Sequence, residues 1–305
     1  MADTDSIARL LFEHTAIRGN LVHLDASWRA VLDTHPYPPG VRVHLGQALA
    51  AVALLSATIK FDGSLILQVQ GCGPLRTLVV QATSARTLRG IARWEGEVPV
   101  GADLAACCGT GRLVLTIERG AGEPYQGIVP LTGAGVAEAL EHYFESSEQL
   151  PTRLWLAADD QRAAGLLLQR LPGTHRDPDQ SKDQHADQRD DQEEDWRRVG
   201  LLAATVTPGE LLGLNTLDLL HRLYHEEDVR LFESEPLAFR CGCSRSRIED
   251  MLRTLGEHEV QSMVAEQGAV TVTCEFCNRT YHLDAVDAGQ LFVHSPRQPP
   301  SAAPH

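Results

Sequence analysis

Arg240-Cys241-Gly242-Cys243 is followed further along the chain by Thr273-Cys274-Glu275-Phe276-Cys277, and these two stretches organise the whole sequence. Four of the seven cysteines lie here in two close pairs. Two thiolates one or two residues apart can hold a metal ion from one side, and a second pair completes a tetrahedron. Zinc accepts four sulfur ligands without strain, although rubredoxin-type iron uses a similar set. We therefore predict that Cys241, Cys243, Cys274 and Cys277 bind one zinc ion per chain.

The composition predicts a folded protein of the cytoplasm. A chain of 305 residues has room for one sizeable domain and a smaller one, and 43% apolar residues allow a core built mainly from Leu, Val and Ala. Residues 1–20 lack the charged-then-apolar order of a signal peptide, and the longest apolar run, residues 48–57, is about half a membrane span. In a reducing compartment, paired cysteines indicate a metal site before a disulfide framework.

The charge argues against two classes of partner. A formal net charge of −14 opposes non-specific nucleic-acid binding, which depends on positive charge, and also opposes binding to anionic membranes. Arg245 and Arg247 form only a small basic patch, so a zinc-ribbon module that binds nucleic acid is the weakest alternative. We expect neither nucleic-acid nor membrane binding.

The first part of the chain predicts an α+β domain over residues 1–173, with a mostly antiparallel sheet. Residues 64–70 and 77–82 form a hairpin pattern around Gly71-Cys72-Gly73-Pro74. Helical spacing predicts four helices, the most apolar of which is the third: residues 5–16, 27–34, 45–59 and 135–146. Further strands are expected at residues 87–94, 112–118, 125–130, 153–158 and 164–170.

Two segments separate this domain from the paired cysteines. Residues 174–195 contain essentially no large apolar side chain, so we predict an acidic disordered linker, most simply a solvated spacer. Residues 196–235 form a helical linker region with helices at 196–206, 208–214 and 216–225. Its segment 218–232 is amphipathic but too polar for a central core, so its helices need something to rest on.

The paired cysteines belong to a small zinc-binding domain predicted over residues 236–293. Helices are expected at 245–254 and 257–266, and a hairpin of residues 269–274 and 280–283 carries the second pair at its turn. Residues 294–305 are expected to be a disordered tail. A module this small buries too little surface to be stable alone. Loss of the metal should therefore unfold it.

Oxidation is one way to remove the metal. Peroxide converts a thiolate to a sulfenic acid that condenses with a neighbouring thiol, and each pair has its partners close together, at some ring strain for Cys241 and Cys243. The metal would leave, the module would unfold, and apolar surface from residues 196–235 would face water. Such surface is the physical requirement for capturing unfolded polypeptides. The alternative is a purely structural zinc site that only stabilises the fold of its own module.

The residues at this point resemble the heat-shock protein 33 family of redox-regulated chaperone holdases, over nearly the whole chain. The resemblance is carried by the order Cys-x-Cys and then Cys-x-x-Cys, and by the following stretches: GCGPLRTLVVQATSARTLRG, SEQLPTRLWLA, GLLLQRLPG, HRLYHEEDVRLFESEPLAFRCGCSR and VTCEFCNRTYHLDAVD. Residues 177–195 match nothing in the family pattern.

The resemblance implies a function and a redox cycle. Reduced, the four cysteines would bind zinc in an inactive monomer; oxidised, they would form the disulfides Cys241–Cys243 and Cys274–Cys277 and release the zinc. The active form would be an ATP-independent holdase without catalytic turnover, which dimerises through the N-terminal domain and binds unfolding proteins under oxidative stress. Apolar residues of the linker region are candidate client-binding residues: Leu219, Leu220, Leu223, Tyr224, Leu231 and Phe232.

Other residues of suggestive chemistry have simpler interpretations. Cys72, Cys107 and Cys108 are expected to be small buried apolar side chains, although the adjacent Cys107 and Cys108 also allow a vicinal disulfide or a metal site. His282, five residues past Cys277, and the pair His221 and His225 are expected to be ordinary histidines rather than ligands.

A thiol–disulfide oxidoreductase that uses Cys274 and Cys277 is the alternative from another functional class. Such enzymes place the nucleophilic cysteine at a helix N-terminus, which lowers its pKa. Here the pair falls between two segments with the pattern of strands. Reduction of insulin above the thiol background would favour this alternative.

Overall fold

The computed structural model describes residues 4–119, 122–131, 133–172 and 182–293, without the side chains of 182–190. The chain folds into two compact units, Met1–Arg240 and Cys241–His305, which we call the first and the second unit. The predicted α+β class is confirmed, since each unit combines helices with antiparallel strands.

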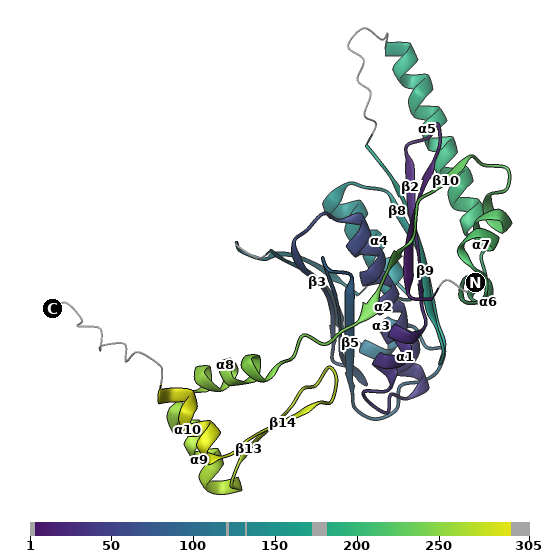
Figure 1. The fold of residues 1–305 in the computed structure, drawn as a ribbon. Coiled ribbons are helices and arrows are strands. Elements are labelled where there is room, and N and C mark those ends of the chain that lie inside the picture. The colour runs from purple at the N-terminus through teal and green to yellow at the C-terminus, as the bar shows by residue number, and fades with distance from the viewer. Residues whose placement is uncertain (1–3, 120–121, 132, 173–181, 294–305) are drawn as a thin grey trace. The chain divides into compact units, whose positions relative to one another are not determined.

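The first unit contains two six-stranded sheets (Figure 1). The order of one sheet is β10-β1-β2-β9-β8, with β11 also paired to β1, and all its pairs are antiparallel. Its strands are β1 Ser6–Phe12, β2 Ile17–Leu24, β8 Thr152–Ala158, β9 Ala163–Arg170, β10 Val229–Leu231 and β11 Glu235–Pro236. We call it the first sheet.

The second sheet has the order β12-β5-β4-β3-β6-β7, antiparallel except for the β12–β5 pair. Its strands are β3 Gly63–Gly71, β4 Leu75–Thr83, β5 Thr87–Trp94, β6 Gly111–Arg119, β7 Tyr125–Pro130 and β12 Ala238–Phe239. The predicted hairpin and all five further predicted strands are therefore confirmed, with bounds that differ by one residue at most for those five.

Helices fill the space between the two sheets (Figure 1). α2, Pro39–Thr58, contacts strands of both sheets and is buried along most of its length, so the predicted buried helix is confirmed with an earlier start. α1 Ala26–Leu32, α3 Leu104–Cys108 and α4 Val136–Tyr143, which continues into the π-helical turn Phe144–Glu148, complete this layer. Among the described residues, α2 alone is long and apolar enough to cross a membrane, a property that buried core helices share.

The prediction of a helix over residues 5–16 is wrong. The chain forms β1 there and turns back into β2, and neither strand was predicted from the sequence. The reason is that β1 packs against apolar clusters on both of its faces. Ile7 packs into the core between the sheets, whereas Leu10 and Phe12 pack into a second apolar cluster on the opposite face. Apolar side chains on both faces remove the alternation that would have indicated strands.

The predicted disordered linker is also corrected over part of its length. Helix α5, Lys182–Ala203, begins well before Asp195, while residues 173–181 and the predicted tail 294–305 lie outside the described residues. Gln, Glu, Arg, Lys and Ala, which are good helix formers, make up half of its residues, although its commonest residue is the poorer helix former Asp. Trp196, Val199 and Ala203 are buried at its C-terminal end, and this packing anchors the helix.

The predicted helical region rests on the first sheet. α6, Pro208–Gly213, contacts β8 and β9, and α7, Thr216–Tyr224, contacts α5. We call the cluster on this face the linker cluster; it joins residues of α5 and α7 to strand residues including Leu10, Phe12, Ile17, Leu21, Leu166 and Leu168. The rings of Phe12 and Tyr224 meet edge to face at 4.8 Å. The support that the amphipathic helices need is therefore supplied within the first unit itself.

The second unit is small and has its own apolar core. It consists of α8 Arg245–Leu255, α9 Glu257–Gln267, the hairpin β13 Val270–Thr273 and β14 Thr280–Leu283, and α10 Ala285–Val293. Both predicted helices and the hairpin are confirmed, while α10 was not predicted. Its buried side chains are few: Ile248, Leu252, Val260, Val270, Leu283, Ala288 and Leu291.

Candidate metal centre

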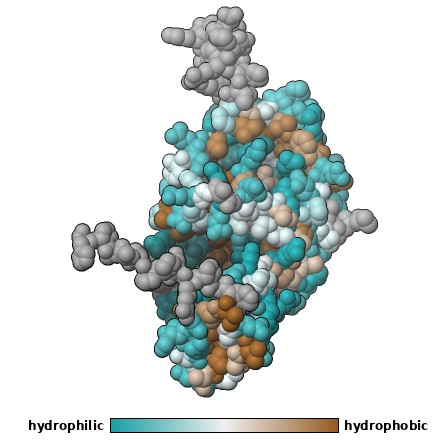
Figure 2. Space-filling view, turned by 60° about the vertical axis from the view of Figure 1, so that its left-hand side comes forward, coloured by the Kyte–Doolittle hydropathy of each residue, from teal (hydrophilic) through white to brown (hydrophobic). Residues whose placement is uncertain are grey.

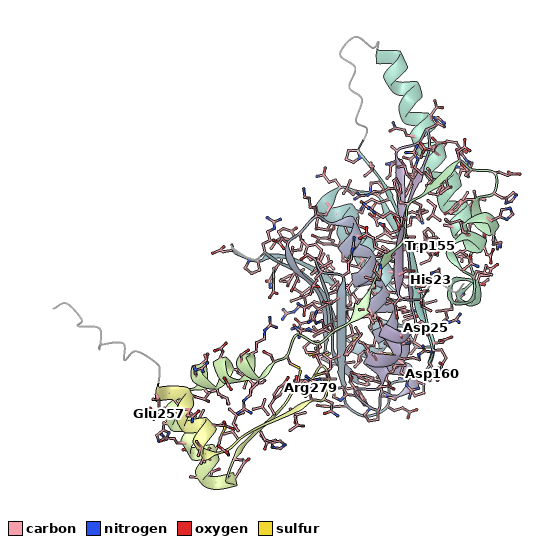
Figure 3. All side chains as sticks on the ribbon, viewed as in Figure 1. His23, Asp25, Trp155, Asp160, Glu257 and Arg279 are labelled. Carbon is pink, nitrogen blue, oxygen red and sulfur yellow. The ribbon has the colours of Figure 1, made fainter. Side chains whose placement is uncertain are left out.

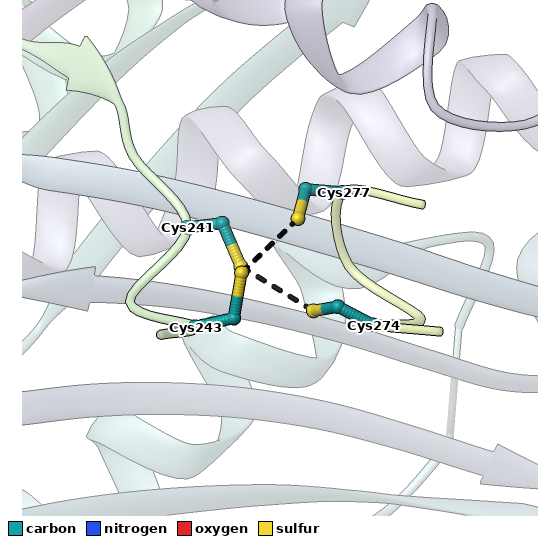
Figure 4. A group of neighbouring side chains, drawn as sticks. All are labelled: Cys241, Cys243, Cys274 and Cys277. Atoms are coloured by element: carbon teal, nitrogen blue, oxygen red, sulfur yellow. Dashed lines mark hydrogen bonds between the residues drawn. The ribbon is translucent and has the colours of Figure 1, made fainter. Parts of the chain in front are cut away.

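The four paired cysteines come together in the second unit (Figure 4). Cys241 and Cys243 lie just before α8, and Cys274 and Cys277 lie in the turn between β13 and β14. This turn is held by backbone hydrogen bonds, from Cys274 N to Arg279 O and from Asn278 N to Cys274 O, both 2.8 Å long. Asn278 adopts φ +56°, a left-handed conformation that Asn tolerates, and so reverses the chain after the second cysteine.

The sulfur atoms fit a tetrahedral metal site. All four Sγ atoms lie within 4.8 Å of one another; those of Cys241 and Cys274 are 3.6 Å apart, and those of Cys243 and Cys277 are 3.3 Å apart. Zinc–sulfur bonds of about 2.3 Å require sulfur atoms about 3.8 Å apart in a tetrahedron. Each of these two contacts joins a cysteine of the first pair to a cysteine of the second. The predicted ligands are therefore arranged as a four-coordinate site requires.

The surroundings shift the pKa values of Cys241, Cys243 and Cys277 in different directions. Burial opposes ionisation of Cys243, but hydrogen bonds from Tyr281 and the other cysteines lower its pKa to about 7. Burial, followed by the neighbouring sulfur atoms, raises the pKa of Cys277 to about 12, and burial also raises the pKa of Cys241. Four thiolates this close need a compensating positive charge, which a divalent cation would supply. The donor set therefore fits a metal ion.

Tyr281 contacts the site from β14. Its hydroxyl donates a hydrogen bond of 3.1 Å to Cys243 Sγ. Arg279, labelled in Figure 3, lies two residues earlier, and a hydrogen bond with Tyr281 raises the pKa of its guanidinium. Tyr281 was not predicted from the sequence. The available signal was its place on a strand directly after the second cysteine pair, where every second side chain faces the same way.

The backbone around the first pair is ordered by α8. Ser244 caps this helix by accepting a hydrogen bond from Arg247 N at 3.2 Å. Arg247 Nη1 donates to the carbonyl oxygen of Gly242 at 2.9 Å. A Cβ atom on Gly242 would lie 2.9 Å from that nitrogen, so glycine between the two cysteines leaves room for the arginine.

We expect Tyr281→Phe to weaken metal binding about tenfold, because the hydrogen bond to Cys243 orients this sulfur and favours its thiolate. Competition with a chromogenic zinc chelator at neutral pH measures the affinity. His282→Ala is the matched control, since the exposed His282 bonds Thr271 at 3.1 Å and lies outside the four-cysteine group. Equal affinities for Tyr281→Phe and the unmodified protein would contradict a role for the hydroxyl.

The remaining candidate residues lie apart from the metal centre. His282 is not part of the cysteine group, and the exposed rings of His221 and His225, 5.8 Å apart, join no cluster of potential ligands within the described ranges. The candidate client-binding residues belong to the first unit. Four of them are buried in the linker cluster: Leu219, Leu220, Leu223 and Tyr224. Leu231 is half-buried against the cluster, and Phe232 is 41% exposed.

Comparison with known proteins places the chain in a family. A sequence model described as "Hsp33 protein" matches residues 5–284. The "33 kDa chaperonin" of Nitrosococcus oceani is 55% identical over 305 residues, covering all of both chains. That of Ectopseudomonas mendocina is 48% identical, covering 99% of each. The crystal structure of the heat shock protein 33 homolog from Thermotoga maritima, 24% identical, covers 94% of this chain and 97% of its own with a TM-score of 0.79, which shows the same fold.

Together, the match of a family model over most of the chain and the full-length similarity to two chaperonins of this name establish the family. The chain belongs to the Hsp33 family.

Proposed function

We propose that this protein is a redox-regulated, ATP-independent holdase that binds unfolding proteins in the cytoplasm. Family membership supports a chaperone. The observation that carries the redox part is the packing of four cysteine sulfur atoms within 4.8 Å in a unit with a small core. The proposed occupant is one zinc ion per chain in the reduced form, because four thiolates in a tetrahedron suit zinc.

Oxidation would remove the ligands two at a time. Each disulfide consumes two thiols and one molecule of peroxide: a thiolate takes one oxygen, the neighbouring thiol attacks the sulfenic acid, and two waters leave. The proposed products are Cys241–Cys243 and Cys274–Cys277. Disulfide sulfur is no longer an anionic ligand, so the metal would be released, and the second unit would lose the larger part of its stability.

Unfolding of the second unit would act on the first unit through the chain that joins them. β12 ends at Phe239, two residues before Cys241, and Arg240 N still donates to Leu88 O at 3.0 Å. Upstream, Glu235 forms ion pairs with Arg9 and Arg86, and β10 pairs with β1. Movement of the chain at Cys241 therefore pulls on a segment that borders the linker cluster.

The linker cluster is the proposed client-binding surface. The proposed contact residues are the following: Leu219, Leu220, Leu223, Tyr224, Leu231 and Phe232. Most of them are covered in the folded first unit. On the face shown in Figure 2, hydrophobic residues are interspersed with hydrophilic ones. Detachment of α6 and α7 would uncover both their own apolar side chains and those of β1, β2 and β9 beneath them. Apolar area of this kind binds unfolded chains.

Light scattering by a thermally denaturing client protein tests the proposal. Protein pretreated with peroxide should suppress scattering, and reduced, zinc-loaded protein should not. Size-exclusion chromatography of both forms tests the further proposal that the oxidised form is a homodimer and the reduced form a monomer. Equal protection by both forms would show that the protein is not redox-regulated.

The structure gives the alternatives little support. Cys274 and Cys277 lie in a turn between two strands rather than at a helix N-terminus, which is where oxidoreductases activate a thiol. Arg245, one of the two residues of the basic patch, is paired with Asp287 at 2.7 Å and with Glu249 at 3.0 Å. We therefore propose no catalytic turnover and no nucleic-acid binding.

A further inference from the structure

Three cysteines outside the metal centre lie close together in the first unit. Cys72 occupies the turn between β3 and β4, and Cys107 and Cys108 end helix α3. Cys72 is exposed, whereas Cys107 and Cys108 are buried, and all three are free thiols. The expectation of small buried apolar side chains is therefore met for the adjacent pair and wrong for Cys72. An exposed thiol beside buried ones is the arrangement in which oxidation can be selective.

The backbone on either side of Cys72 packs tightly against Cys108. Gly73 N donates a hydrogen bond of 2.6 Å to Cys108 O. A Cβ atom on Gly71 would lie 2.7 Å from Cys108 Cβ, and one on Gly109 would lie 3.1 Å from Cys72 Sγ. A side chain at Gly71 would force its neighbours apart, and one at Gly109 would be tightly packed and strained at φ +62°, so these glycines allow the turn to approach α3 this closely. Both cysteines are thus held at one contact between two segments distant in sequence.

The two buried thiols have different surroundings. Cys107 Sγ lies 3.6 Å from His44 Nε2 and 4.0 Å from Ala102 O, so it faces α2. Burial raises the pKa of the Cys108 thiol to about 12, and the adjacent Cys107 and then Cys72 add to the effect. The backbone contacts of Gly71 and Gly73 with Cys108, and the contact of Cys107 with His44, make Cys108 the partner of the exposed thiol.

We propose that Cys72 and Cys108 form a disulfide when the protein meets hydrogen peroxide, at a modification site separate from the metal centre. Peroxide transfers one oxygen to Cys72 Sγ, giving a sulfenic acid and one water. The Cys108 thiol then attacks this sulfur, its proton joins the departing hydroxide, and a second water leaves. Two thiols are oxidised and one peroxide is reduced. The Cys108 thiol is a poor nucleophile while protonated, so the second step requires loss of its proton as it attacks.

The disulfide would join the β3–β4 turn to the end of α3, directly before β6. The contact lies inside the first unit and involves no residue of α5, α6 or α7. Its formation would therefore restrict movement between the second sheet and α3, and it would not restrict detachment of the helices of the linker cluster. This inference goes beyond the proposed function, and its readout does not depend on holdase activity.

Mass spectrometry of the full-length, zinc-loaded protein tests the proposal. The protein is treated with peroxide, denatured, alkylated with iodoacetamide and digested with trypsin without reduction. Cys72 and the pair Cys107 and Cys108 fall on different tryptic peptides, because Arg76, Arg89 and Arg93 lie between them. We expect a cross-linked species in which fragmentation between residues 107 and 108 assigns the bond to Cys108 and leaves Cys107 alkylated. Six of the seven thiols are then consumed.

Cys72→Ser provides the matched variant, since an exposed side chain is replaced by one of similar size. It should abolish the cross-link, leave Cys108 alkylated and release zinc at the rate of the unmodified protein. Recovery of Cys72 as a free thiol, as a sulfinic acid, in a bond to Cys107, or in a bond to Cys72 of a second molecule would overturn the proposal. Retention of the cross-link when zinc release fails would instead count against the proposed function alone.

Discussion

Replacing Cys277 with Ser should unfold the second unit and leave the first unit folded. The apolar core of the second unit contains few side chains, most of them on short elements. Binding of a structural zinc ion contributes about 10–16 kcal/mol, which matches or exceeds the net stability of a whole domain, about 5–15 kcal/mol. A neutral hydroxyl in place of one of four thiolates should remove most of that contribution.

Limited proteolysis followed by mass spectrometry measures this result for each unit separately. Cleavage sites within residues 241–293 should become accessible in Cys277→Ser, while the strands of the two sheets stay protected. Far-ultraviolet circular dichroism should lose the helical signal of α8, α9 and α10. Cys72→Ser is the control, because it removes a thiol that lies in the other unit. A second unit that keeps its protease resistance in the zinc-free variant would show that its apolar core suffices.

The clustering of the four cysteines was predictable because the information that specifies it is local. Cys241, Cys243, Cys274 and Cys277 stand in two short motifs whose spacing limits where the sulfur atoms can go, and a hairpin pattern brings the second pair to a turn. Tyr281 was not predictable in the same way. Its contact with Cys243 depends on which face of β14 meets the first pair, and that is a tertiary relation.

Strands β3 to β7 were predictable because their burial is mostly one-sided. Strands β3 to β7 alternate or stand between clear turn residues, so residues such as Leu65, Leu67 and Val69 mark one buried face. β1 and β2 are covered on both faces, and their pattern does not distinguish a strand from a buried helix. The extended start of α5 was missed because a polar sequence predicts disorder unless packing elsewhere anchors it, as Trp196 and Val199 do here.

The linker cluster also changes how activation must work. On sequence alone, α7 could have depended on the zinc-binding module for support, so that loss of the metal would release it directly. Leu219 and Leu223 instead pack with Phe12 and Leu166, which belong to the first sheet. In the proposed mechanism, loss of the metal would therefore have to overcome this packing or loosen it through the segment that ends at Arg240. The stability of the linker cluster would then set how readily the proposed client-binding surface becomes exposed.

Leu219→Asp should accordingly make the reduced, zinc-loaded protein bind clients without oxidation. Leu219 is fully buried in the linker cluster, so the substitution leaves a cavity and places a carboxylate among apolar side chains. Truncation of a buried leucine to alanine costs about 2–5 kcal/mol, and an unpaired buried charge costs more. The helix can avoid that cost by leaving the sheet. Detachment uncovers the apolar faces of α7 and of β1 and β9 together.

Three measurements in the presence of reductant and zinc check this expectation. Fluorescence of a hydrophobic dye should rise several-fold, light scattering of a denaturing client should fall, and protease should cleave within residues 196–232. The chelator assay should still find the zinc bound, which separates this effect from oxidation. Leu217→Asp on the same helix is the control, because Leu217 is 68% exposed and its replacement should change none of these readouts.

The milder Leu219→Ala keeps the test informative if the aspartate variant unfolds the whole first unit. It leaves a cavity without adding a charge. We therefore expect dye binding between that of the unmodified protein and that of Leu219→Asp, and we expect client binding to begin at a lower peroxide concentration than in the unmodified protein. The decisive comparison is between the release of α7, measured by protease cleavage, and the protection of the client from aggregation, measured by light scattering. If protease shows α7 released while clients still aggregate as fast as without the protein, the linker cluster is not the client-binding surface, and the site must lie elsewhere on the chain.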